Sequence, residues 1–391
     1  MSALMLTYWI NNTMLRPLMG PYAASRGADA ALIGVVLAAW ALPACLFAIP
    51  IGLLADRRGY RVVLVGGSAL LVAGTGLLAL IRSPLLLLVP QTCIGVGAVA
   101  VWLSLQGLMI AARGSGEESV EARRKRITNY SALGMVGQLV GPAVGGFLTD
   151  LWGYRGAFAV AAVLALGCLA ASLGLPRIPR REEGGGSGEP MSVGALAGSF
   201  RGAGQLLRGP GVLLTMGASF CTLYLLDVRN GFQPLYFHEL GLSASFIGVL
   251  LSVSGLFTLV ARVVVVRLMS RFASGTVIAM TIVPSAVTVC GVILFHQPVV
   301  LFVLAAFAAL LLGVLQPITL ALTADYTTKF QRGIGVGLRM VANRTAQWVD
   351  PTAFGALLTF GGFTVAFGVT GVLMASAGLV MGICLNAQAR R

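Results

Sequence analysis

The residues best suited to chemistry in this sequence are polar side chains inside long apolar segments. They are Asn12, Arg16, Gln91, Gln106, Asp227, Arg229, Asn230, Gln316, Arg339, Asn343 and Asp350. A carboxylate at such a position can take up and release a proton, and a guanidinium can hold an anionic group. Because charged groups inside a membrane cost free energy, they commonly mark a solute or proton route, so we predict a substrate or proton path. Gln106 and Gln316 could instead bond locally to the backbone.

Asp227 is the first candidate for a carboxylate that carries a proton. It lies about 25 Å into the apolar segment 210–237 at a helical rise of ~1.5 Å per residue. Arg16 lies at a similar depth in the segment 2–24. We expect these two side chains to form a pair between the two halves of the chain or a shared substrate contact. A fixed structural ion pair is the alternative.

A second polar face is predicted in the segment 333–357. Arg339, Asn343 and Asp350 are separated by nearly whole helical turns, so they share one side of a helix. Asp350 could carry a proton or bind a cation, and it could also simply pair with Arg344.

Few residues suit other kinds of chemistry. The lysines, Lys125 and Lys329, do not belong to a phosphate-binding loop, and the histidines, His238 and His296, have no catalytic partners nearby in the sequence. The six cysteines lie singly in apolar segments, which is typical of small buried side chains. We therefore expect no enzymatic activity, no metal site and no cofactor.

The composition indicates that the candidate residues lie in membrane-spanning helices. Hydrophobic residues make up 57% of the 391 residues and charged residues 10%, whereas soluble domains carry about 25% charged residues. Since a membrane-spanning helix needs about 20 mainly apolar residues, we predict an all-α membrane protein with about twelve transmembrane helices. The predicted spans are 2–24, 30–54, 62–81, 85–111, 127–149, 155–176, 210–237, 243–267, 274–295, 298–323, 333–357 and 362–387.

The predicted spans fall into two equal groups around a hydrophilic linker. Residues 177–209 contain the run GGGSGEP, which is typical of a flexible cytoplasmic linker between an N-terminal bundle at 1–176 and a C-terminal bundle at 210–391. The bundles also resemble each other, because GADAALIGVVL at 27–37 matches GLSASFIGVLL at 241–251. Such repeats predict two pseudo-symmetric six-helix bundles with a substrate site at the membrane midplane between them.

Basic residues are distributed unevenly among the predicted loops. They concentrate in alternate loops, including the charged loop 113–126, whereas the remaining loops hold Arg26, Arg82 and Arg155. The positive-inside rule then places both termini in the cytoplasm, and we expect a bacterial cytoplasmic (inner) membrane. The net charge of +14 is assigned to topology and to anionic lipid, not to nucleic acid. We expect a monomer.

The loop after the second span carries glycines and charges in a distinctive order. It reads GLLADRRGYR over 52–61, where Gly59 permits a tight turn. The pattern resembles a loop signature of the major facilitator superfamily, although Tyr60 stands where that family usually has a basic residue. The resemblance implies a conformational latch on the cytoplasmic side of the two halves. Its residues are Gly52, Asp56, Arg57, Gly59 and Arg61.

The segment 127–149 holds glycines around one proline, which suit close helix packing and a kink. The residues are Gly137, Gly141, Pro142, Gly145 and Gly146. This pattern resembles the signature of the drug:proton antiporter branch of the same superfamily. Gln91 departs from that branch, which usually has an arginine four residues before the position of Gly95.

These resemblances imply a secondary active transporter that works by alternating access. The expected activity is proton-coupled efflux of a small amphipathic or drug-like compound. The excess of arginines over aspartates in the predicted spans leaves open an anionic or zwitterionic metabolite as the substrate. A membrane sensor of the same fold that does not transport is a further alternative. The expected partners are a small-molecule substrate, protons and membrane lipid.

Overall fold

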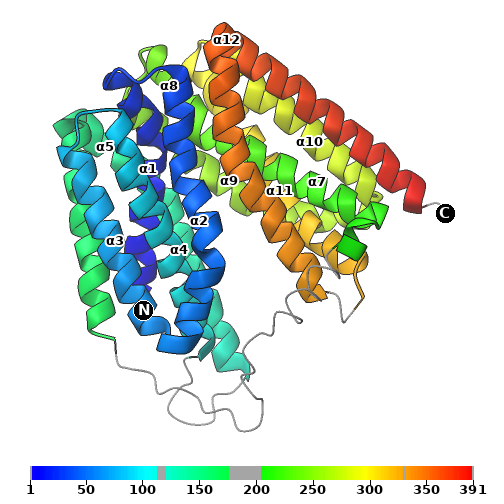
Figure 1. Ribbon diagram of the computed structural model, residues 1–391. Coiled ribbons are helices and arrows are strands. Elements are labelled where there is room, and N and C mark those ends of the chain that lie inside the picture. The colour runs from blue at the N-terminus through cyan, green and yellow to red at the C-terminus, as the bar shows by residue number, and fades with distance from the viewer. Residues whose placement is uncertain (1, 112–119, 176–203, 329–331, 390–391) are drawn as a thin grey trace. The chain divides into compact units, whose positions relative to one another are not determined.

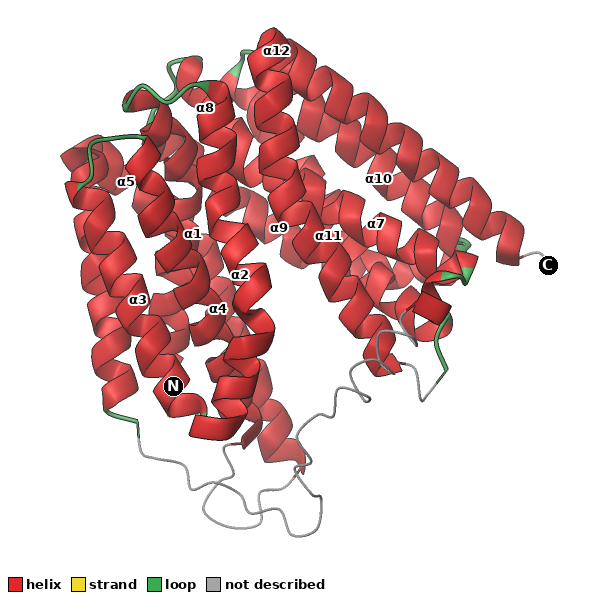
Figure 2. Cartoon of the chain, viewed as in Figure 1, coloured by secondary structure: helices red, strands yellow, loops and turns green. Residues whose placement is uncertain are grey.

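A computed structural model describes residues 2–111, 120–175, 204–328 and 332–389, and the regular structure in these ranges is helical (Figure 2). The elements are α1 (Ser2–Ser25), α2 (Ala30–Arg58), α3 (Tyr60–Leu80), η1 (Leu85–Leu87), α4 (Leu88–Ala111), α5 (Val120–Leu173), α7 (Pro210–Asp227), η2 (Val228–Phe232), α8 (Gln233–Glu239), α9 (Ala244–Arg271), α10 (Ser274–Cys290), η3 (Gly291–Leu294), α11 (Pro298–Asp325) and α12 (Arg332–Ala389). Figure 1 shows α1 to α5 as long neighbouring helices.

Most of these helices are long and apolar enough to cross a membrane. Nine stretches of the described residues meet that criterion. Two of them, Asn129–Leu173 and Ile334–Gln388, are long enough for two crossings each. Both contain a glycine with positive φ, Gly153 at 69° and Gly362 at 64°, where the helix breaks. With α1, these crossings confirm the predicted architecture of about twelve spans.

α1 is long enough to span the membrane, but it is more polar than its neighbours. Its 24 residues include Asn11, Asn12 and Arg16, with Pro17 and Pro21 also inside the helix. Prolines remove backbone donors, and membrane helices tolerate them where neighbouring groups satisfy the freed carbonyls. This composition agrees with the polar path predicted along the helix.

The described residues divide into two compact units. The first combines the described part of Met1–Arg180 with Asn230–Gly255 and Pro351–Thr359. The second holds the whole of α7, α10 and α11 together with the remaining parts of α9 and α12. The first unit therefore includes short pieces from the second half of the sequence. The bundle limits predicted from the sequence remain a prediction.

In the first unit, α1 packs on α5, and α3 packs on α4. The fully buried Tyr22 of α1 places its hydroxyl 3.1 Å from the carbonyl oxygen of Leu78 and its ring 4.8 Å from the ring centre of Phe158. Between α3 and α4, a Cβ added at Gly97 would lie 2.8 Å from the carbonyl oxygen of Gly67. Small residues thus bring the two backbones close together, as is usual for helices packed within lipid.

In the second unit, α11 packs on α10 and on α7. Asn386 of α12 holds the start of α10, because its amide donates to the Thr276 hydroxyl at 2.9 Å and its Oδ1 accepts from the Thr276 N–H at 3.2 Å. This bond satisfies one of the free donors at the N-terminus of α10.

Three segments differ in detail from the sequence-based prediction. α5 begins at Val120, so the end of the predicted loop 113–126 is helical, as its good helix formers allow. The predicted span 210–237 contains the π-helical turn η2. Most of the predicted linker 177–209 lies outside the described residues.

Candidate functional site

The two charged candidates of the seventh predicted span lie next to an irregular turn. Within the helical stretch Pro210–Glu239, Val228–Phe232 forms a π-helix. Asp227 ends the preceding α-helix and is 3% exposed, Arg229 lies within the turn and is 4% exposed, and Asn230 is half-buried. Single π-helical turns are rare and frequently occur at functional sites. The structure therefore places Arg229 and Asn230 in a locally unusual backbone, with Asp227 directly before it.

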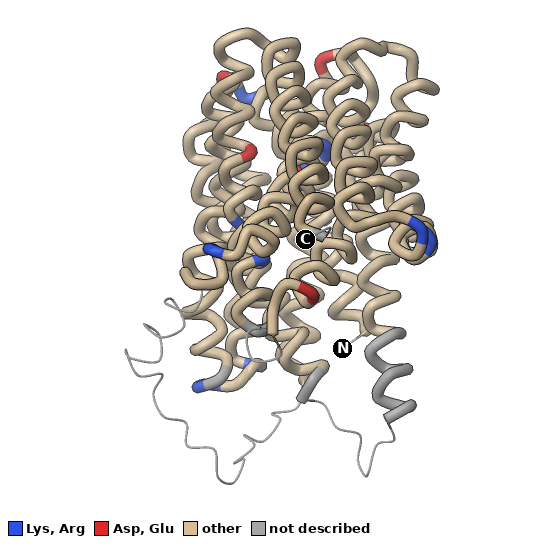
Figure 3. Tube along the Cα trace, turned by 90° about the vertical axis from the view of Figure 1, so that its right-hand side faces the viewer, with Lys and Arg blue, Asp and Glu red and all other residues tan. Residues whose placement is uncertain are grey.

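Charged residues are sparse along the helices, as the tube in Figure 3 shows. On α1, the amide of Asn12 donates to the Tyr8 hydroxyl at 3.2 Å, and that hydroxyl donates to the Ala98 carbonyl of α4 at 3.1 Å. The guanidinium of Arg16 lies 4.9 Å from the ring centre of Trp40, a cation–π contact. The predicted pairing of Arg16 with an aspartate of the seventh span remains a prediction.

α4 carries the two predicted glutamines at different depths. Gln91 is 3% exposed, whereas Gln106 is half-buried. At ~1.5 Å per residue they lie about 22 Å apart along the helix, so they cannot contact one small solute together. A role for both in one path would require them to act at successive positions.

The second unit brings two predicted path residues together. Arg339 of α12 donates to the side-chain oxygen of Gln316 at 2.8 Å and to its carbonyl at 3.2 Å, and its Nε lies 3.3 Å from the Thr319 hydroxyl. Gln316 thus bonds to a neighbouring helix. The sequence-based reasoning missed Thr319, because a threonine in an apolar helix most often bonds to its own backbone. Arg344 donates to Gln347 at 2.9 Å.

Asp350 and Asn343 also lie on α12, as predicted. Asp350 is 1% exposed and interacts electrostatically with Tyr224 and Cys290 of neighbouring helices in the second unit. Asn343 is half-buried, and its side-chain oxygen has no hydrogen-bond partner among the described residues. An ionisable group buried in a membrane span is costly and usually functional, which keeps Asp350 among the candidates.

The turn between α2 and α3 has the geometry predicted for it. Gly59 separates the two helices with φ at 93°, a conformation that favours glycine. Arg61 donates to the carbonyl of Leu173 at the end of α5, within the first unit. This bond ties the start of α3 to α5.

The rest of the predicted latch is less defined. A Cβ added at Gly52 would meet no described atom within 4 Å, so the structure gives no close helix approach there. Arg57 is exposed, and the side chain of Asp56 lies outside the described part of the chain. The latch itself therefore remains a prediction.

The glycines of α5 form a packing face, as their spacing indicates. A Cβ added at Gly137, Gly141 or Gly145 would lie 2.7–2.9 Å from a backbone carbonyl oxygen of α1. Backbone atoms cannot rotate away, so side chains at these positions would push the two helices apart. Three of the four predicted glycines thus fix the contact between α5 and α1.

The remaining glycine and Pro142 meet α9 instead. A side chain at Gly146 would overlap the carbonyl of Ala244, and a side chain at Gly248 would overlap the carbonyl of Pro142. The N–H of Ala143 donates to the Ser252 hydroxyl at 3.0 Å. All of these residues belong to the first unit, and we refer to this packing as the α5–α9 contact.

Asp150 completes the α5–α9 contact, and the sequence-based reasoning did not identify it. Its two carboxylate oxygens accept hydrogen bonds from the N–H groups of Ala244 at 3.1 Å and Ser245 at 2.7 Å. These donors belong to the first turn of α9, where backbone N–H groups lack helical partners and a negative charge is favoured. The only signals in the sequence were an aspartate at a span end and a serine-rich helix start, which lie far apart along the chain.

A second contact in the first unit repeats this packing. A side chain at Gly34 of α2 would overlap the carbonyl of Pro351 of α12. In the same way, a side chain at Gly248 would overlap the carbonyl of Pro142. Gly34 matches Gly248 in the internal repeat identified in the sequence. The two halves of the sequence therefore make equivalent proline–glycine contacts.

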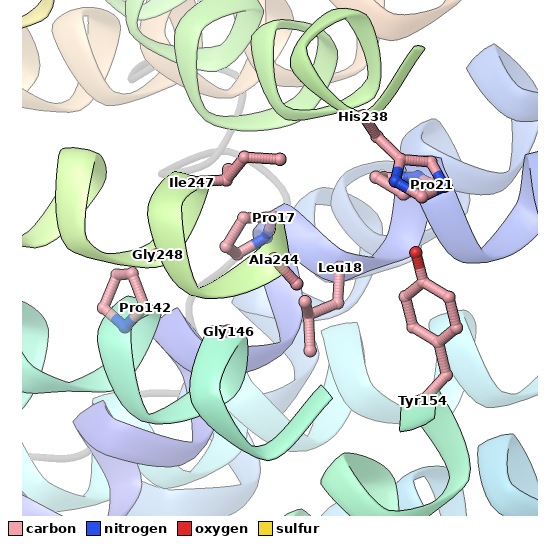
Figure 4. A pocket seen from close by; sticks show the side chains of 10 residues that line it. All are labelled: Pro17, Leu18, Pro21, Pro142, Gly146, Tyr154, His238, Ala244, Ile247 and Gly248. Atoms are coloured by element: carbon pink, nitrogen blue, oxygen red, sulfur yellow. The ribbon is translucent and has the colours of Figure 1, made fainter. Parts of the chain in front are cut away.

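A small pocket borders the α5–α9 contact. Its empty volume, counted together with the open space at its mouth, is about 300 Å³, and Figure 4 shows the side chains that line it. The lining residues are Pro17, Leu18, Pro21, Pro142, Gly146, Tyr154, His238, Ala244, Ile247 and Gly248. Because the lining is mostly proline, glycine and aliphatic carbon, the pocket offers few polar groups to a solute.

Comparison with known proteins identifies the relationship of the whole chain. The Major Facilitator Superfamily family model matches residues 1–228 and 215–390. The inner membrane transport protein YajR of Escherichia coli is 38% identical over 88 residues, which cover 22% of this chain and 19% of YajR. The multidrug resistance protein Stp of Mycobacterium tuberculosis is 31% identical over 125 residues, covering 32% of this chain and 22% of Stp.

Solved structures agree with this relationship at the level of the fold. A mutant of the nucleoside transporter NupG superimposes with a TM-score of 0.81 at 12% identity, covering 99% of this chain and 98% of NupG. The peptide transporter POT in complex with sulfate superimposes with a TM-score of 0.74 at 18% identity, covering 100% of this chain and 94% of POT. At these identities the similarity concerns the fold alone.

Proposed function

The chain belongs to the Major Facilitator Superfamily, a family of transporters and not of enzymes, and from this premise we propose that it moves a small solute by alternating access. The proposed activity is proton-coupled efflux of a small amphipathic compound. The observation that carries the proposal is Asp227, a carboxylate only 3% exposed beside a π-helical turn in a membrane span. The stretch of sequence similar to a multidrug resistance protein supports efflux as the direction.

A second candidate is transport of an anionic or zwitterionic metabolite. It is favoured by the arginines at membrane depth, among them Arg16, Arg229 and Arg339. Guanidinium groups stay charged, so together they would give the solute path a positive potential.

Solute flux into proteoliposomes that contain the purified protein tests the proposal. With an imposed pH gradient, the wild-type protein is expected to move at least one member of a panel of cationic, neutral and anionic aromatic solutes against its concentration gradient. Collapse of the pH gradient with a protonophore should stop that movement. A protein that binds a solute from the panel but gives no flux would instead be a sensor of the same fold.

In a transport cycle with alternating access, the α5–α9 contact and the turn between α2 and α3 would each act on one side of the membrane. We propose that the α5–α9 contact forms and breaks as the solute path opens on the side away from the cytoplasm, following the topology predicted from the basic loops. The turn around Gly59 and Arg61 would act on the cytoplasmic side, together with Asp56 and Arg57. Both termini would lie in the cytoplasm of a bacterial cell, with the protein in its inner membrane as a monomer.

Replacing Asp150 with alanine is expected to weaken the α5–α9 contact. Loss of a carboxylate that caps a helix N-terminus costs about 1 kcal/mol, which would lower the ratio of closed to open contact by roughly fivefold and so speed labelling of the open form. The rate at which a membrane-impermeant maleimide labels Leu18→Cys in a cysteine-free protein measures this ratio, because Leu18 lines the adjacent pocket and is 5% exposed.

The matched control is Asp150→Asn, which keeps one of the two oxygens that accept from these backbone N–H groups. It should label at a rate between those of the wild type and Asp150→Ala, since one oxygen can still cap the helix but the amide nitrogen cannot accept the second bond. Equal labelling of the alanine variant and the wild type would remove Asp150 from the contact's energetics.

A further inference from the structure

Arg229 is a deeply buried arginine with a guanidinium nitrogen that is unbonded in the described part of the chain. The residue is 4% exposed, and its Nε has no hydrogen-bond partner among the described residues. Its neighbours in the same helical stretch, Leu225 and Val228, are fully buried apolar side chains. From these observations we propose that Arg229 binds an anionic group, a carboxylate or a phosphate, of the transported compound. This inference rests on the transport function proposed above.

Burial makes an uncompensated arginine costly. Its guanidinium stays protonated in proteins, so it cannot escape the cost by losing a proton. Removing such a group from water without a partner carries a large free-energy penalty, which an opposite charge or several hydrogen bonds must offset. A transported anion would supply both when it binds, because the planar fork of a guanidinium matches the two oxygens of a carboxylate or phosphate.

Asp227 is the nearest acid along the chain, and its position does not suit it to bond with Arg229. Residues two apart project toward different sides of an α-helix, and the same holds for the wider turns of a π-helix such as the one that begins at Val228. The carboxyl group of Asp227 and the guanidinium of Arg229 therefore lie at a similar depth in the span but point in different directions. This arrangement suits a proton on the carboxyl group and an anionic solute on the guanidinium.

The other span arginines whose side chains are described have contacts that Arg229 lacks. Arg16 lies over the ring of Trp40, Arg339 donates to Gln316, and Arg344 donates to Gln347. Each of these arginines is also only half-buried, so water or lipid headgroups can share its charge. Arg229 combines deep burial with an unbonded nitrogen, which distinguishes it as the anion site.

The stability of the empty protein provides the first test. If the charge of Arg229 is balanced only when an anion binds, Arg229→Met should raise the thermal unfolding midpoint of the purified protein in ligand-free buffer. The substitution removes a buried charge that has no partner there. If Arg229 instead supports the fold through bonds to the backbone, the same variant should unfold at a lower temperature, and the proposal would be overturned.

Binding of matched probes provides the second test. Benzoate, benzamide and benzylammonium have one ring and differ in charge, and phosphate serves as a fourth probe. Benzoate or phosphate should raise the unfolding midpoint of the wild type, and binding should weaken by more than about tenfold in Arg229→Met. Arg229→Lys should bind with intermediate strength, since it keeps the charge but loses the fork. Arg344→Gln, a span arginine with its own partner, should bind like the wild type.

The outcomes separate this inference from the transport proposal. Failure of both anions to bind the wild type, or equal binding to Arg229→Met, would overturn the anion site. Flux of benzoate in proteoliposomes that is unchanged in Arg229→Met would also overturn it while leaving transport intact. Anion binding that depends on Arg229, with no flux of any probe, would sustain the site and refute transport.

Discussion

Asp227→Asn is expected to abolish pH-driven transport while leaving a folded protein in the membrane. Asparagine has nearly the same shape as aspartate, but its amide cannot take up and release a proton. Asp227 is 3% exposed and lies in an apolar helical stretch, where an ionisable group is costly and usually functional. Solute movement driven by an imposed pH gradient in proteoliposomes should therefore fall to the level of protein-free vesicles.

Two comparisons make this result specific. Asp29→Asn is the matched control, because Asp29 is exposed and caps α2 through the Leu32 N–H at 2.7 Å, a bond that asparagine can also accept. It should transport normally. Solute exchange at equal pH on both sides gives the second comparison. If Asp227 carries only the proton, exchange survives in Asp227→Asn, and if it also contacts the solute, exchange is lost. Undiminished gradient-driven flux would exclude Asp227 from coupling.

The transmembrane architecture could be predicted because it depends on properties that each segment carries by itself. Apolar length determines whether a helix can span, and the glycines at 153 and 362 mark the two places where long helices break. α1 was predicted as a span even though it is more polar than its neighbours and is not among the nine stretches of the described residues that meet the criterion. Its asparagines and arginine are also what made it a candidate for the solute path.

The π-helical turn could not be predicted from the sequence. Its residues, Val-Arg-Asn-Gly-Phe, differ little from an ordinary helical segment in hydrophobic spacing, and one extra residue in a turn leaves no clear periodic signal. Sequence reasoning did place Asp227, Arg229 and Asn230 among the candidates on charge and polarity alone. The irregular backbone adds a second, independent reason to regard them as functional.

Pairings between distant segments were only partly predictable. Arg339 and Gln316 were both candidates, but their bond depends on the packing of α12 on α11, which no local pattern reports. The repeat between 27–37 and 241–251 aligns Gly34 with Gly248, but the sequence does not indicate what either glycine contacts. Each proves to pack against the carbonyl of a proline. Asp150 has no such local signal, because its partners lie in another helix.

The second large effect is expected at Gly146. A Cβ at this position would overlap the Ala244 carbonyl and lie 2.8 Å from its carbon and 3.0 Å from the Ser245 Cα. These are backbone atoms, so no rotamer change can make room, and closely packed interiors transmit such a displacement. Gly146→Val should therefore hold α5 away from the start of α9, lower transport by more than about tenfold, and increase maleimide labelling of Leu18→Cys.

Gly167→Val tests whether this loss is specific to the contact. Gly167 lies in the same helix, and a Cβ there would meet no described atom within 4 Å, so transport and labelling should match the wild type. A Gly146→Val protein with normal transport would show that the α5–α9 contact does not form during the cycle.

The double variant Gly146→Val with Asp150→Ala tests whether both residues act on the same α5–α9 contact. Mutations that act on one contact are not additive, whereas independent ones are. Once valine has separated the helices, the carboxylate of Asp150 can no longer reach the N–H groups of Ala244 and Ser245, so its removal should cost nothing further. Labelling of the double variant should then equal that of Gly146→Val alone. An additive increase would mean that Asp150 and Gly146 stabilise different states, and that the carboxylate acts outside the α5–α9 contact.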